Sequence, residues 1–465
     1  MQYDNVGRPA HQRVRHNGRT LLDKSYLWGD NLRLLQTLDT INGRSVRYDY
    51  DTFGSLSGAV YGDGSCQWRN PDAMGNVYDS PDRTDRNYGR GGQLREDKKW
   101  RYYYDSQGNL VLKSMRRSGP SLETGMRDEF LAWQSGDYAY TWQGNGMLRS
   151  VTRPDGKTVT FRYDALGRRI EKVFDGRVYR YLWDGDVILH EWDYTEADRP
   201  NTIVTETGEV TLDRPEPVEN LITWVYDSDN YVPTAKIVGD RHYSIISDYI
   251  GRPVQVYDDK GNVVWQADYD IYGNLRNLHG SRQFIPFRQL GQYEDDETGL
   301  YYNRFRYYDP RIGNYISQDP IRLAGGNNPT LYGYVSDSNN RMDLLGLNKT
   351  SWWLHDSDGS LLDSGTMKPD PKAKTIPGRV GDSEQKILKT IETRHAGNLE
   401  GTKLTINSEP TFIKTPTGKT VKIEGIKPCD FCDARMDEFA IKNKMQIEYN
   451  YRGKQVSYPK AKVCS

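Results

Sequence analysis

The chain has 465 residues, of which 36% are hydrophobic and 27% are charged, and its formal net charge is -1. This length allows two or three domains. It contains no run of about 18 apolar residues, which excludes a membrane-spanning helix, and its start lacks the apolar core of a secretory signal. Four cysteines in a chain of this length exclude a disulfide scaffold.

The aromatic and turn-forming residues predict a mostly β fold. The chain has 34 Tyr and 11 Trp but only 10 Phe, together with 44 Gly and 21 Pro. Tyr and Trp bury a large ring while keeping a polar tip, and frequent Gly and Pro favour short strands joined by tight turns. A helical bundle is therefore disfavoured.

Charge is distributed unevenly along the chain. Residues 348–465 contain 20 Lys and Arg against 15 Asp and Glu, a net charge of +5, so the rest of the chain carries -6. Such asymmetry indicates separate roles for the two parts. A basic C-terminal segment is compatible with a polyanionic substrate.

A repeat of Tyr-Asp, two further residues and Gly recurs in the first part, with copies that begin at Tyr3, Tyr50, Tyr104, Tyr163, Tyr257 and Tyr269. Asp and Gly supply the turn of a hairpin, and Tyr packs across neighbouring strands. The segments that follow, such as 109–114, 168–174 and 262–269, are predicted strands. Short strands of this kind are expected to stack into one long sheet, with a Tyr-rich β-sandwich as the alternative.

These repeats resemble the tyrosine–aspartate repeats of the Rhs family, and residues 297–347 are similar to the Rhs-associated core of polymorphic toxins. The resemblance implies a hollow β-cocoon that encloses a variable C-terminal toxin. It divides the chain into a YD-repeat β shell (1–296), an Rhs-associated core with a self-cleavage region (297–347) and a toxin domain (348–465). Family shells are longer than this one, so we expect the C-terminal part of a shell or a shortened copy.

In the family, an aspartyl-type self-cleavage frees the toxin, and the two aspartates that carry it out lie in separate DPxG elements. The corresponding residues here are Asp319 and Asp343, with the cut between Leu347 and Asn348. Two carboxyl groups that are brought together can share a proton, so that one acts as base and the other as acid.

Both elements depart from the family pattern, because Arg322 replaces the Gly of the first and Leu344 replaces the Pro of the second. Aspartate is also a common turn residue beside Pro and Gly. A purely structural role for Asp319 and Asp343 is therefore the alternative.

The pattern changes at Asn348, where the repeats stop and Lys-rich periodic segments begin. An α+β or α/β domain is predicted from these elements: a hairpin (351–367), a helix (382–397), strands (403–408 and 411–425), a second helix that starts at Pro428, and strands (445–451 and 452–458).

Cys429 and Cys432 lie three residues apart at the start of the second predicted helix, where the helix dipole favours thiolates and metal binding. A lone Cys-x-x-Cys is compatible with half a zinc ribbon, a redox pair or an open catalytic zinc site. No second Cys pair is present to complete a four-ligand ribbon.

The sequence Asp-Ser-Glu at 382–384, followed by Pro-Cys-x-x-Cys, resembles the zinc nucleobase deaminases of bacterial polymorphic toxins. The resemblance implies a small cytidine-deaminase-like α/β domain with Zn²⁺ held by Cys429, Cys432 and Asp382, which stands where most families have His. Glu384 would be the proton shuttle. The implied reaction is hydrolytic deamination of a nucleobase, with cytosine to uracil in DNA expected before RNA.

Two structural details bear on this assignment. Asp382 is also a candidate helix N-cap with Gln385 as its capping-box partner, and His395 lies about 20 Å along the helix, too far to replace Asp382 as a ligand. A metal-dependent nuclease and a non-catalytic zinc-binding module are the alternative functions.

The family resemblance also implies partners and a location. We expect a nucleic-acid substrate, a cognate immunity protein, a secretion apparatus, and a toxin domain enclosed by its own shell. The protein would be an effector secreted without a signal peptide, and its toxin domain would act in the cytoplasm of the target cell.

Overall fold

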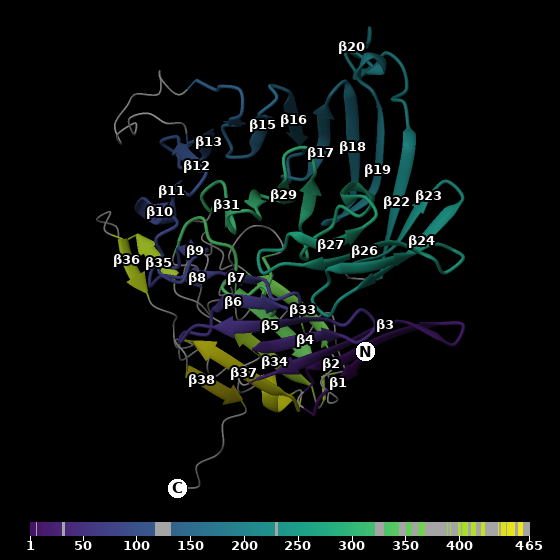
Figure 1. Cartoon of the computed structure of the whole chain (residues 1–465). Helices are drawn as coiled ribbons and strands as arrows, with labels where there is room; N and C mark the ends of the chain where they lie inside the picture. The colour runs from purple at the N-terminus through teal and green to yellow at the C-terminus, as the bar shows by residue number, and fades with distance from the viewer. Residues whose placement is uncertain are drawn as a thin grey trace. The chain divides into compact units, whose positions relative to one another are not determined.

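The computed structural model describes residues 1–5, 7–29, 33–116, 132–227, 231–320 and 330–343 (Figure 1). In the C-terminal segment it describes 350–355, 361–367, 388, 391, 399–400, 402–407, 411–414, 420–423, 436, 439–442, 444–451 and 454–458. The chain forms two compact units. The larger contains Arg13–Pro320 and Thr330–Gly346, and the other contains Met1–Gln12, Ile321–Pro329 and Leu347–Ser465.

The first strands form a seven-stranded sheet in chain order. We call it the N-terminal sheet, and its strands are β1 (Gln2–Tyr3), β2 (Pro9–His16), β3 (Arg19–Trp28), β4 (Leu34–Asp39), β5 (Arg44–Tyr50), β6 (Leu56–Tyr61) and β7 (Cys66–Trp68). Two short strands, β8 (Asn70–Pro71) and β9 (Val77–Tyr78), then pair only with each other among the described residues.

The next repeats build a sixteen-stranded sheet, also a meander. Its strands are β10 (Asn87–Tyr88), β11 (Leu94–Glu96), β12 (Trp100–Tyr104), β13 (Leu110–Met115), β14 (Tyr138–Trp142), β15 (Leu148–Thr152), β16 (Thr158–Tyr163), β17 (Arg169–Phe174), β18 (Arg177–Asp184), β19 (Val187–Thr195), β22 (Glu219–Tyr226), β23 (Pro233–Val238), β24 (Arg241–Ser247), β25 (Pro253–Tyr257), β26 (Val263–Tyr269) and β27 (Leu275–His279). The described residues of this region also form 3-10 turns at Arg90–Gly92, Glu196–Asp198 and Arg282–Phe284, and a hairpin of β20 (Thr202–Val204) and β21 (Val210–Leu212).

The predicted strands at 109–114, 168–174 and 262–269 are confirmed as β13, β17 and β26. The expectation of one long sheet is wrong, because the repeats are divided between two sheets. The division falls around β8 and β9, where Pro71 in β8 and Pro81 after β9 have no backbone N–H to donate to a continuing ladder.

Each Tyr-Asp turn closes on its own aspartate. The carboxylate Oδ1 accepts the backbone N–H groups two and four residues later in the turns of Asp51, Asp105, Asp164, Asp258 and Asp270. The aspartate carbonyl accepts the N–H of the turn glycine, whose φ lies between 74° and 89°. Glycine adopts this left-handed conformation without the steric cost that other residues incur.

In the repeats of Asp51, Asp164 and Asp270, the tyrosine that precedes the aspartate links adjacent strands. The hydroxyl groups of Tyr50, Tyr163 and Tyr269 donate to the carbonyls of Leu34, Leu148 and Pro253 at 3.0, 2.8 and 2.6 Å. Each acceptor is the first residue of the preceding strand. The ring therefore covers the sheet while its polar tip is satisfied by the backbone.

A four-stranded sheet follows, with β28 (Tyr293–Asp295), β29 (Leu300–Asn303), β30 (Arg306–Asp309) and β31 (Asn314–Tyr315). In Figure 1 the sixteen-stranded sheet forms an arc, and β29 and β31 lie within it. Residues of the small sheet such as Tyr302 and Tyr307 share one buried core with Tyr102, Phe161 and Trp224 of the large sheet. The small sheet is thus packed against the large one.

In the other unit, β33 (Leu361–Met367), β32 (Thr350–His355), β34 (Lys403–Asn407), β37 (Gln446–Tyr451) and β38 (Lys454–Tyr458) form a sheet in that order. Strands β34 and β37 are parallel, and the other pairs are antiparallel. Strands β35 (Thr411–Lys414) and β36 (Thr420–Ile423) form a hairpin. Helical residues are described at Leu388, Ile391, Met436 and 439–442.

Within the part of the chain that the structure describes, no helix has the length and apolarity needed to cross a membrane.

Replacing a turn aspartate tests the role of the repeat. Asp105→Ala removes the acceptor of the Gln107 and Asn109 N–H groups, at 2.9 and 2.8 Å, and of the Asn109 side-chain amide at 3.1 Å. We expect the free energy of unfolding, measured by urea denaturation, to fall by about 1–3 kcal/mol. Ser106→Ala, which removes an exposed hydroxyl from the same turn, is the control. Equal effects of the two changes would contradict this role.

Candidate active site

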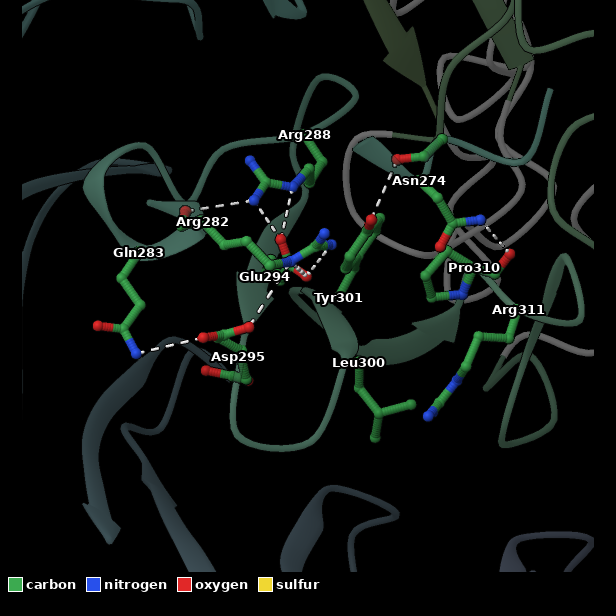
Figure 2. Close-up of polar contacts among 12 residues, drawn as sticks. Asn274, Arg282, Gln283, Arg288, Glu294, Asp295, Leu300, Tyr301, Pro310 and Arg311 are labelled. Atoms are coloured by element: carbon green, nitrogen blue, oxygen red, sulfur yellow. Dashed lines mark hydrogen bonds and ion pairs between the residues drawn. The ribbon is translucent and has the colours of Figure 1, made fainter. Parts of the chain in front are cut away.

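The four-stranded sheet carries the candidate site and is held by buried ion pairs. On β28, Glu294 lies between two guanidinium groups (Figure 2). Arg282 Nη2 lies 2.6 Å from Glu294 Oε1, and Arg288 Nε donates to Oε2 at 2.7 Å. On β29, the Tyr301 hydroxyl donates to the carbonyl of Gly273 at 3.1 Å. These contacts fix the edge of the small sheet against the preceding chain.

Two further pairs join the small sheet to the large one. Arg169 on β17 lies 2.5 Å from Asp295, and Lys113 on β13 lies 3.0 Å from Asp309, all four side chains being at most 1% exposed. Burial lowers the pKa of Lys113 to about 8, although the Asp309 carboxylate opposes that shift. Burial alone would raise the pKa of Asp309, but Arg311 and Lys113 hold it well below its usual range. Breaking either pair would leave a buried charge without its partner.

The two aspartates expected from the sequence meet at one guanidinium. Arg306 Nη2, at the start of β30, lies 3.1 Å from Asp319 Oδ2 and 2.9 Å from Asp343 Oδ2. The two carboxylate oxygens are therefore at most about 6 Å apart. The three side chains are 0%, 2% and 4% exposed, so the centre is shielded from bulk water.

Neighbouring polar groups orient this centre. The Tyr315 hydroxyl donates to Asp343 Oδ2 at 2.9 Å, and its ring lies 3.6 Å from the Arg306 guanidinium carbon. The Asn303 amide donates to the Tyr315 hydroxyl at 2.7 Å and to the Asp343 carbonyl at 2.8 Å. The Asp319 N–H donates to the carbonyl of Leu331 at 2.9 Å. Each of the two aspartates is thus held through its backbone and through its carboxylate.

The other predicted site residues are Leu347, Asn348, Asp382, Glu384, Cys429 and Cys432, and all of them lie outside the described residues. Among the described residues, no group of three or more His, Cys, Asp and Glu side chains is placed to hold a metal ion. The zinc site therefore stays a prediction from the sequence.

Sequence reasoning missed Arg306, Tyr315 and Asn303. All three lie within the segment 297–347 that resembles the Rhs-associated core, but nothing in their spacing relates them to either aspartate. Asn303 and Arg306 face each other across the tight β29–β30 turn. Recognising that hairpin register would have placed both side chains near one end of the small sheet.

A family model described as the teneurin YD-shell matches residues 1–333. The chain belongs to the teneurin YD-shell family. The expected YD-repeat shell is thereby confirmed.

Among the relatives of this YD-shell chain, double-stranded DNA deaminase toxin A of Burkholderia cenocepacia (strain H111) is 32% identical over 74% of the chain. Probable deoxyribonuclease RhsA of Dickeya dadantii (strain 3937) is 30% identical over 67%, and toxin protein Tse5 of Pseudomonas aeruginosa (strain PAO1) is 32% identical over 71%. The chain covers only 24%, 20% and 27% of these three proteins.

A third buried carboxyl lies on the YD-shell segment that leads to Asp343. Asp337 is 2% exposed, and its Oδ1 accepts the Asn339 N–H at 2.9 Å. Burial raises the pKa of Asp337 to about 6, against the opposing charges of Arg69 and Arg341. Burial therefore makes ionisation of Asp337 less favourable in the folded protein than in an exposed chain, so this carboxyl takes up a proton near pH 6.

This shift predicts a pH-dependent stability effect. The pKa of Asp337 is higher in the folded chain than its ordinary value near 4, so the folded state binds the proton more tightly, and this stabilisation is lost as the pH rises through about 6. Asp337→Asn resembles the protonated form. We expect its free energy of unfolding to exceed that of the wild type by about 1–3 kcal/mol at pH 8 and to match it near pH 4. Urea denaturation at both pH values measures this, and a variant that is less stable at pH 8 would contradict it.

Proposed function

We propose that this YD-shell chain contains a self-cleavage centre that cuts the peptide bond between Leu347 and Asn348. The observation that carries the proposal is the convergence of Asp319 and Asp343 on Arg306 in a buried site. Two carboxyl groups within about 6 Å of each other, oriented by a shared cation, are suited to act as an acid–base pair, which supports the proposal.

The chemistry assigns a separate task to each group. One carboxylate removes a proton from a water molecule, whose oxygen forms a bond to the carbonyl carbon of Leu347. The other carboxyl group donates a proton to the nitrogen of Asn348 as the C–N bond breaks. The products are a Leu347 carboxylate and an Asn348 amine. Arg306 keeps the two carboxyl groups together through both proton transfers.

At the level of the whole protein, we propose an interbacterial toxin in which the YD shell carries the segment 348–465 as an enzymatic cargo. The toxin names of the relatives support this, since the chain is about 30% identical to each of them over most of its length. The proposal includes a secretion apparatus, a cognate immunity protein, and action of the cargo in the cytoplasm of the target cell.

For the cargo, we propose a zinc-dependent nucleobase deaminase, with cytosine in DNA as the first substrate. Two thiolates and a carboxylate, Cys429, Cys432 and Asp382, form an acceptable zinc donor set, and zinc bound there would activate a water molecule. Glu384 would carry the proton from that water to the departing amine.

Two observations support an α/β cargo of this kind. Parallel strands such as β34 and β37 require a crossover connection, usually helical, and the connection between them contains Cys429, Cys432 and the helical residues 439–442. One relative is named as a double-stranded DNA deaminase toxin. Another is named as a probable deoxyribonuclease, which keeps a nuclease as the second candidate function.

The self-cleavage proposal is tested with the full chain. The wild type is expected to yield two fragments whose masses correspond to residues 1–347 and 348–465, as measured by mass spectrometry. Asp319→Asn and Asp343→Asn should each lower the cleavage rate by at least about 100-fold, because either change removes the acid or the base. Asp296→Asn, which alters a carboxylate on the neighbouring β-turn, is the control. Cleavage of the Asp343→Asn chain at the wild-type rate would refute the proposal.

The cargo proposal is tested in bacteria that lack uracil repair. Expression of the full chain should cause C-to-T changes across the genome, and Glu384→Ala should reduce them to background while Glu392→Ala, in the same predicted helix, should not. Strand breaks without mutations would favour the nuclease. Toxicity that is lost in Cys429→Ser but kept in Glu384→Ala would instead indicate a zinc-binding module without catalysis.

A further inference from the structure

Asp343 reaches the centre at the end of a bound stretch of chain, residues 330–343, which we call the strap. The Tyr332 carbonyl accepts the Tyr315 N–H at 2.8 Å. The Gln289 amide donates to the carbonyls of Ser338 and Arg341 at 2.9 and 3.0 Å. Because the strap is bound along its length, the contacts upstream of Asp343 act together with those of Arg306, Tyr315 and Asn303 to place its carboxylate.

A further set of these contacts comes from Arg69, directly after β7. Its guanidinium donates to the carbonyls of Val335 and Ser336 at 2.5 and 2.9 Å, and to that of Leu56 at 3.3 Å. The Leu56 N–H also donates to the Ser336 carbonyl at 3.0 Å. Arg69 is only 5% exposed, so these charge-assisted hydrogen bonds form away from bulk water.

Arg69 and Leu56 belong to the N-terminal sheet or its edge, whereas Arg306 belongs to the four-stranded sheet. Arg69 and Val335 are 266 positions apart in the chain. Closing so long a loop costs conformational entropy, and Arg69 can reach the strap only when the N-terminal sheet lies beside it. The strap is therefore completed only when the N-terminal sheet has docked.

Docking of that sheet also uses residues that do not themselves contact the strap, although the same cluster includes Leu56 and Ile271, which bind Ser336 and Ser338 of the strap. Ala59 and Tyr61 share a buried cluster with Ile271 and Tyr272, which follow β26. Arg44 pairs with Asp268 at 2.9 Å. The N-terminal sheet can thus be displaced by substitutions that touch neither the strap nor Arg306.

We infer that Arg69 is a positioning residue that makes self-cleavage conditional on docking of the N-terminal sheet. This inference rests on the proposed self-cleavage. Arg69 acts on the strap backbone and, through it, on the placement of Asp343 beside Asp319. A chain whose N-terminal sheet has not docked keeps its cargo covalently attached, and the docked chain cuts it.

The first experiment follows cleavage of the full chain during cell-free synthesis. Arg69→Gln should slow cleavage by about 10- to 100-fold, because a small displacement of a reacting group has an effect of this size. Arg69→Lys, which keeps the charge, should recover part of the rate. Arg83→Gln is the matched control. Arg83 is an exposed arginine whose guanidinium donates to the side-chain oxygen of Asn70, the residue next to Arg69.

Chemical rescue separates positioning from a general loss of structure. Arg69→Ala leaves a space for a guanidinium group, so millimolar ethylguanidinium should restore cleavage in this variant and leave Asp343→Asn uncut. Absence of rescue, or cleavage of Arg69→Gln at the wild-type rate, would overturn the inference.

The second experiment displaces the sheet itself. Ala59→Glu places a charge in the buried cluster, where Ala59 is 2% exposed, and should prevent docking and slow cleavage as strongly as Arg69→Gln. Phe53→Glu, at a side chain 87% exposed in the same sheet, is the control. Limited proteolysis reports docking. Rapid cleavage of an Ala59→Glu chain whose N-terminal sheet is protease-sensitive would overturn the inference.

Failure of the inference is distinguishable from failure of the proposed function. If Asp343→Asn is cut like the wild type, the aspartyl mechanism itself is wrong. If Asp343→Asn is uncut while the Arg69→Gln and Ala59→Glu chains are cut normally, the mechanism stands and conditional cleavage is wrong.

Discussion

The shell depends on the aspartate of each Tyr-Asp turn, because that side chain satisfies the backbone N–H groups that a tight turn leaves unpaired. With the turns closed locally, strands of five to eight residues, such as β12, β16 and β18, extend as long meanders. The neighbouring tyrosine adds a tether, since its hydroxyl binds a carbonyl of the preceding strand. This explains a chain that is rich in Tyr and poor in Phe. Many of its core rings have a polar tip that donates to a backbone carbonyl or to a carboxylate.

Buried charge determines where the four-stranded sheet lies. Arg169 with Asp295 and Lys113 with Asp309 connect it to two different strands of the large sheet. Such pairs contribute little net stability relative to apolar residues, but a shifted position would leave each charge unpaired and buried. The same reasoning applies to Arg306, which compensates the carboxylates of the candidate centre. These ion pairs therefore determine the position of the small sheet and of the two carboxylates more than they add to the stability of the fold.

Much of this arrangement could be predicted from the sequence, and the reason lies in its local character. The Asp and Gly of a turn act within five residues, so the strands near Asp105 and Asp258 were predictable. Asp319 and Asp343 could be chosen from their motif, but the arginine whose side chain lies between theirs could not. Arg304, Arg306 and Arg311 lie within eight residues, and only the β29–β30 register selects one of them. The role of Arg69 could not be predicted for a different reason, since no local sequence pattern relates it to Val335 of the strap, 266 positions away. The deaminase residues lie outside the described structure and stay predictions.

A centre assembled in this way connects cleavage to the integrity of the fold. Asp319 follows the small sheet directly, while Asp343 is brought to it by a strap that Arg69, Gln289 and Asn303 hold from three parts of the shell. All of these contacts lie on the N-terminal side of the proposed cut after Leu347. Cleavage there breaks one covalent bond and removes none of them, so the shell keeps the strap and both carboxylates in place. The proposed cut therefore changes the covalent attachment of the cargo and leaves the contacts that hold the two carboxylates intact.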